Sequence, residues 1–144
     1  MPYKTNISIF LPNGPISGLI DSYRILVAIE LALKDGGFNG GPSGHDIPGM
    51  LAQASVRCPT LAAQLQAHQA RLATDFAQII CNSRNGNPVA ATASNYPHAR
   101  YTRFIGDWAG VSETPVLAMV ALTQTCNSLL NDLQKHSAQL GIQI

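Results

Sequence analysis

The chain is poor in charge. Only 12% of its 144 residues are charged, about half the usual share, and the formal net charge is +1. This composition excludes an acidic solvating tail and a basic nucleic-acid coat, and a hydrophobic share of 46% excludes a disordered chain. The arginines are too dispersed to follow a phosphate backbone, so we expect no nucleic acid among the partners.

The shortage of charge also bears on assembly. A soluble monomer usually carries charge on about a quarter to a third of its surface positions, which keeps molecules apart. A chain of net charge +1 has little self-repulsion, so much of its surface could lie against copies of itself. We therefore expect a homo-oligomer. The alternative is a monomer whose surface is covered by Gln, Asn and Thr.

Cysteine is scarce as well. The chain has three cysteines, Cys58, Cys81 and Cys126, and none of them form a Cys-x-x-Cys motif. An odd number of widely spaced cysteines is typical of free thiols in a reducing compartment. We expect three free thiols and a cytoplasmic protein.

No long hydrophobic run is present. Pro12 and Pro15 interrupt the apolar stretch near the N-terminus, so no signal-peptide core forms there. The most apolar run, at 19–33, contains charged residues and is shorter than the roughly 20 residues that span a bilayer. The sequence predicts a soluble chain without a membrane partner.

Hydrophobic periodicity predicts three longer helices, at 16–35, 60–81 and 115–140, and one short helix from Asp46 to about Val56. Asp46 is a suitable N-cap, and Pro48 suits the first turn of the short helix. Thr114 and Pro115 are equally suitable at the start of the last helix. Its seam recurs at spacings of three and four: Met119, Leu122, Cys126, Leu129, Leu133, His136 and Leu140.

Little β-structure is expected beside these helices. Residues 5–11 alternate in the manner of a short N-terminal strand, and 89–93 could pair with 99–105 in a small hairpin around Asn95-Tyr96-Pro97. The predicted fold is mainly α (α+β). Residues 1–144 would form a single compact helical domain of three longer helices and one short helix, with the strand and the hairpin as minor elements.

Function-capable side chains are densest between residues 96 and 108. Aromatic and arginine side chains together are typical of interface hot spots, and they also suit a small anionic or nucleotide-like ligand. The alternative is an edge hairpin whose rings cover the core. The candidate ligand or interface residues are Tyr96, His98, Arg100, Tyr101, Arg103, Phe104 and Trp108.

The segment 36–49 holds six of the twelve glycines. It resembles a phosphate-binding loop only in composition, because a helix precedes it and no Gly-Lys-Ser/Thr ends it. We expect a lid or an assembly arm instead.

No cofactor and no metal is expected. The histidines His45, His68, His98 and His136 are scattered, and no His-x3-His or Cys-x2-Cys spacing is present. His68 and His136 fall within apolar seams, where a histidine is usually a core residue and not a ligand. Cys126 also falls in a seam and is expected to be inert packing.

Three functional hypotheses remain. The first is a non-catalytic, self-associating subunit, either a structural or assembly protein or an oligomeric binding protein. The second is a binder of a small anionic or nucleotide-like ligand through the Arg/aromatic segment. The third is a small hydrolase centred on Glu30, which lies in a very apolar helical stretch shortly before the glycine-rich segment.

Overall fold

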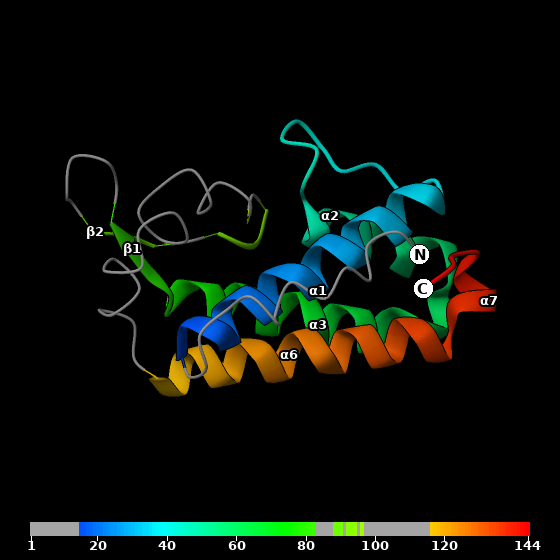
Figure 1. The fold of residues 1–144 in the computed structure, drawn as a ribbon. Coiled ribbons are helices and arrows are strands. Elements are labelled where there is room, and N and C mark those ends of the chain that lie inside the picture. The colour runs from blue at the N-terminus through cyan, green and yellow to red at the C-terminus, as the bar shows by residue number, and fades with distance from the viewer. Residues whose placement is uncertain (1–14, 83–87, 91, 95, 97–115) are drawn as a thin grey trace.

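A computed structural model describes residues 15–82, 88–90, 92–94, 96 and 116–144 (Figure 1). The fold is mainly helical, as predicted. Its elements in chain order are α1 (Pro15–Asp35), α2 (Ile47–Arg57), the 3-10 turn η2 (Pro59–Leu61), α3 (Ala62–Ala77), β1 (Ile80–Asn82), β2 (Pro88–Ala90), α6 (Val116–Lys135) and α7 (Ser137–Leu140).

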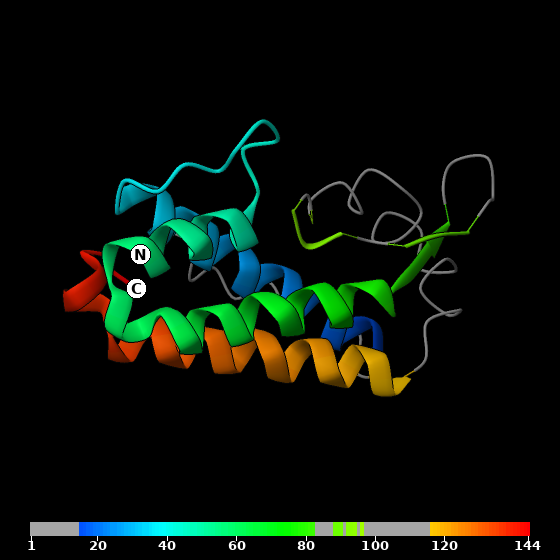
Figure 2. The ribbon, with the colours of Figure 1, turned by 180° about the vertical axis from the view of Figure 1, so that it is seen from behind.

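The three long helices lie side by side. Helix α6 packs against both α1 and α3, and α2 lies on α3 (Figures 1 and 2). Each helix turns an apolar stripe inward, as the three-and-four spacing requires. Leu26, Ile29 and Leu33 of α1 are buried, and so are Leu129 and Leu133 of α6. No helix within the described ranges is long and apolar enough to cross a membrane.

The short helix α2 forms as predicted. The Asp46 side chain accepts a hydrogen bond from the Gly49 backbone N–H over 3.0 Å, and a proline occupies the first turn. Ile47, Met50 and Leu51 are buried beneath the helix. Asp46 caps α2, so residues 47–49 of the glycine-rich segment lie within this helix.

The C-terminal helix is shorter than predicted. Helix α6 ends at Lys135, and α7 forms a separate single turn after His136. Gly141 then adopts a left-handed conformation with φ of 71°, which glycine tolerates better than other residues. The interruption of the helix at His136 changes the direction of the chain, and Leu140 and Ile142 are both buried.

The predicted helix at 60–81 also ends early. It comprises η2 and α3, and the chain leaves the helix after Ala77 to form β1. Strand β1 pairs antiparallel with β2, with Cys81 opposite Val89. Strand β2 begins at Pro88, which lies opposite Asn82, and residues 83–87 lie outside the described residues.

The predicted hairpin between 89–93 and 99–105 is therefore not supported. Among the residues that can be placed, Val89 lies in a strand whose partner is 80–82. The segment 99–105 lies outside the described residues, and so does the predicted N-terminal strand at 5–11.

Substitution of Leu129 by Ala tests the packing of α6. Leu129 is fully buried, so the change should lower the free energy of unfolding by about 2–5 kcal/mol. Denaturant unfolding measures the loss. Val56 of α2, which is 81% exposed, provides the surface control Val56→Ala. A loss under about 0.5 kcal/mol for Leu129→Ala, as at surface sites, would contradict the packing.

Candidate functional site

A buried carboxylate lies at the centre of the candidate site. Glu30 sits on α1 between Ile29 and Leu33, and only 6% of it is exposed. A buried carboxylate is costly unless other groups donate hydrogen bonds to it. The hydrogen-bond donors around Glu30 therefore determine whether burial of its carboxylate is tolerated.

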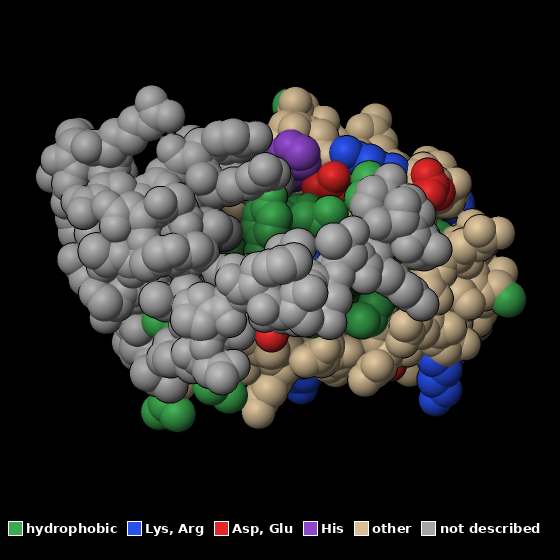
Figure 3. Space-filling model, viewed as in Figure 1, with side chains coloured by type: hydrophobic (Ala, Val, Ile, Leu, Met, Phe, Trp, Pro, Cys, Tyr) green, Lys and Arg blue, Asp and Glu red, His purple; other side chains and the backbone are tan. Residues whose placement is uncertain are grey.

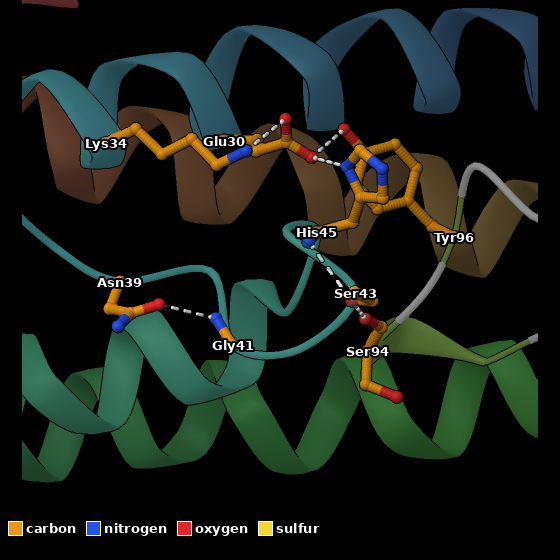
Figure 4. Close-up of polar contacts among 8 residues, drawn as sticks. All are labelled: Glu30, Lys34, Asn39, Gly41, Ser43, His45, Ser94 and Tyr96. Carbon is orange, nitrogen blue, oxygen red and sulfur yellow. Dashed lines mark hydrogen bonds and ion pairs between the residues drawn. The ribbon is translucent and has the colours of Figure 1, made fainter.

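Three side chains from three parts of the chain meet Glu30 (Figure 4). Tyr96 Oη donates to Oε1 over 2.9 Å, and His45 Nδ1 lies 2.7 Å from the same oxygen. Lys34, one helical turn after Glu30, donates from Nζ to Oε2 over 3.3 Å. We call Glu30, Lys34, His45 and Tyr96 the Glu30 cluster. Both carboxylate oxygens of Glu30 are thus occupied by donors.

The glycine-rich segment carries His45 to the carboxylate. Its backbone folds on itself where Asp46 N–H donates to the Gly40 carbonyl over 3.0 Å. A side chain at Gly40 would collide with the Gly44 carbonyl, and Gly44 itself has φ of 80°. Asn39 exchanges hydrogen bonds of 2.8 Å with Gln53 of α2. The glycine-rich segment, which we expected to be a lid or an assembly arm, is thus hydrogen-bonded to both α1 and α2.

Tyr96 joins a third segment of the chain to the Glu30 carboxylate. It is 2% exposed, and its ring packs edge-on against Tyr23 with centroids 5.5 Å apart. The Ser43 hydroxyl donates to the Ser94 carbonyl over 3.0 Å, so the glycine-rich segment and the chain before Tyr96 are also joined directly (Figure 4). Burial, followed by the nearby Glu30 charge, raises the pKa of Tyr96 far above its usual range, and the phenol remains a donor.

The sequence-predicted site is only partly placed. Tyr96, its first residue, lies in the Glu30 cluster. The remaining candidates fall outside the described residues: His98, Arg100, Tyr101, Arg103, Phe104 and Trp108. Sequence analysis missed the roles of His45 and Lys34. The signal available for Lys34 was its spacing of four residues from Glu30.

Other polar groups lie between the long helices. His68 of α3 is buried, and its Nε2 lies 2.6 Å from Asp132 of α6. This agrees with the prediction of a core histidine. Thr125 of α6 donates a short hydrogen bond to Asp75 of α3. Burial, followed by the Asp75 charge, raises the pKa of Cys126 to about 12. These contacts link α3 to α6.

Nothing in the described portion of the chain brings together three His, Cys, Asp or Glu side chains that could hold a metal ion. At the surface, histidine, acidic and basic side chains adjoin one another beside a patch of hydrophobic side chains (Figure 3). The Glu30 cluster can therefore orient the imidazole of His45. A molecule bound beside it would meet both polar and apolar side chains. Comparisons with protein-family models, curated proteins and solved structures gave no match.

The free energy of unfolding should fall as the pH rises above 10. A tyrosine in the unfolded chain ionises near pH 10, whereas Tyr96 keeps its proton in the folded state because its pKa is raised. The stability contributed by this difference is present below pH 10 and is lost at about 1.4 kcal/mol per pH unit above it. Urea unfolding at several alkaline pH values measures the slope. Tyr96→Phe should have a smaller slope, and equal slopes in both proteins would contradict the burial of this phenol.

The thiols should be protected in the native protein. Cys58 and Cys126 are free and buried, and a pKa of about 12 leaves Cys126 with little thiolate at pH 8. A disulfide-exchange reagent should label neither residue until denaturant is added, as peptide mapping would detect. In denaturant without reductant, three thiols per chain should react. A count of one would instead mean an intramolecular disulfide.

Proposed function

We propose that the chain is a self-associating subunit, either a structural or assembly protein or an oligomeric binding protein. The observation that supports this proposal is an almost uncharged outer surface on α3 and α6. The two helices lie side by side in both views, so their outer faces adjoin (Figures 1 and 2). A large surface without charge has little to keep it apart from another copy.

The composition of this surface is unusual for water-facing helices. Among the exposed residues described in α3 and α6, Arg71 and Lys135 are the only charged ones. The rest of the α3 face consists of Ala63, Gln64, Gln66, Ala67, Ala70, Ala73, Thr74 and Ala77, and the rest of the α6 face of Leu117, Val120, Gln124, Asn127, Asn131 and Gln134. We call this the α3/α6 face.

Two features of the α3/α6 face suit contact with a second helical surface. Leu117 and Val120 are 83% and 46% exposed, and they lie one turn apart at the start of α6. Burying such side chains contributes about 25 cal/mol per Å² of apolar area removed from water. The alanines of α3 allow close approach, and the amides can hydrogen-bond without the cost of burying a charge.

The second candidate is a binder of a small anionic or nucleotide-like ligand through the Arg/aromatic segment. It is supported by the position of Tyr96, the first residue of this segment, which is buried beside Glu30. Arg103→Ala tests this candidate through the loss of any ligand-induced rise in melting temperature.

Light scattering after size-exclusion chromatography tests self-association. The wild-type mass should be a multiple of the chain mass, 15.3 kDa. The double variant Ala70→Glu, Gln124→Glu places negative charge on the α3/α6 face of every copy. Like charges across a symmetric interface repel, so the dissociation constant should rise at least about tenfold, an effect of roughly 1.4 kcal/mol.

The matched control carries the same two residue changes elsewhere. Ala52 of α2 and Gln143 near the C-terminus are exposed and outside the α3/α6 face. Ala52→Glu, Gln143→Glu should keep the wild-type mass. A wild-type protein of 15.3 kDa at its highest soluble concentration would refute self-association, and equal effects of the two double variants would refute this face as the interface.

A further inference from the structure

The contact between Glu30 and His45 has a chemical consequence beyond self-association and independent of it. His45 Nδ1 lies 2.7 Å from Glu30 Oε1, and a carboxylate oxygen accepts hydrogen bonds. Nδ1 therefore carries the proton. In a neutral imidazole the lone pair is then on Nε2, the nitrogen that can accept a proton from another molecule.

The neighbours of Glu30 keep the pair in this orientation. Tyr96 Oη donates to the same oxygen, Oε1, and Lys34 donates to Oε2, so the carboxylate is held from both sides. The glycine-rich segment holds the backbone of His45, whose N–H donates to Ser43 Oγ over 3.1 Å. The imidazole is thus fixed by its ring and by its main chain.

The solvent exposure of the side chains differs within the Glu30 cluster. The Glu30 side chain is 8% exposed, whereas that of His45 is 38% exposed. A buried carboxylate behind a partly exposed imidazole is the arrangement that orients a histidine as a general base. Lys34 lies beside Gly44, the residue before His45, and only one of its three N–H groups is used by Glu30. Lys34 and the imidazole contact opposite oxygens of the same carboxylate (Figure 4).

We propose that His45, positioned by Glu30, acts as a general base that activates water against small carboxylic esters with an apolar group. Nε2 takes a proton from water while the water oxygen bonds to the acyl carbon. The tetrahedral intermediate then collapses, its ester C–O bond breaks, and the leaving oxygen takes the proton back from Nε2. Neighbouring hydrophobic side chains receive the apolar group (Figure 3).

Hydrolysis of p-nitrophenyl acetate and p-nitrophenyl butyrate by the full chain tests the proposal. The release of p-nitrophenolate should exceed the buffer rate and saturate with ester concentration. His45→Gln should lower kcat/KM about 100-fold, a typical contribution of general-base catalysis. Glu30→Gln keeps an acceptor for Nδ1 but removes the charge, so it should lower kcat and leave KM nearly unchanged.

His136→Gln is the matched control, because His136 is also partly exposed and no carboxylate is paired with it among the described residues. It should retain wild-type activity. Wild-type turnover at the buffer rate, or equal turnover by wild type and His45→Gln, would overturn the proposal.

A second measurement on the unmodified chain does not depend on how the variants fold. Diethylpyrocarbonate acylates neutral imidazole, and peptide mass mapping then gives a rate for each histidine. An oriented Nε2 lone pair predicts that His45 reacts several-fold faster than His136. A slower reaction at His45 would overturn the proposal.

Discussion

The burial of one carboxylate, that of Glu30, governs how the rest of the molecule is joined. A charge inside an apolar helix face is tolerated only with donors on its oxygens, and here the donors are Lys34, His45 and Tyr96. Because these residues come from α1, the glycine-rich segment and the chain near residue 96, satisfying the carboxylate also fixes the arrangement of three distant segments (Figure 4). The same contacts hold the partly exposed imidazole of His45.

The helical part of the fold could be predicted from local patterns. Apolar spacing identified α1, α3 and α6, and the N-cap chemistry of Asp46 placed the start of α2. These predictions depend on contacts within a few residues. The ends were less accurate, because tertiary packing turned the chain after Ala77 and at His136, where burial of Leu140 and Ile142 replaces one further turn of helix.

The site was less predictable than the helices. The apolar surroundings of Glu30 indicated burial, and the density of side chains after residue 95 drew attention to Tyr96. The partner His45 could not be inferred, because 14 residues separate it from Glu30, the last nine of them in the glycine-rich segment, and no periodicity relates the two positions. The pairing of β1 with β2 was also missed, because 80–81 continued a helical pattern and 89–93 was expected to pair with 99–105.

Hydrogen exchange in Glu30→Met tests most directly whether Glu30 fastens the three segments. Methionine has a similar length and cannot replace the carboxylate as an acceptor for Tyr96 and His45. The account predicts faster amide exchange in peptides covering 39–46 and 92–96, with unchanged exchange in α6 between residues 122 and 133. Unchanged exchange in both 39–46 and 92–96 would contradict the central role of this carboxylate.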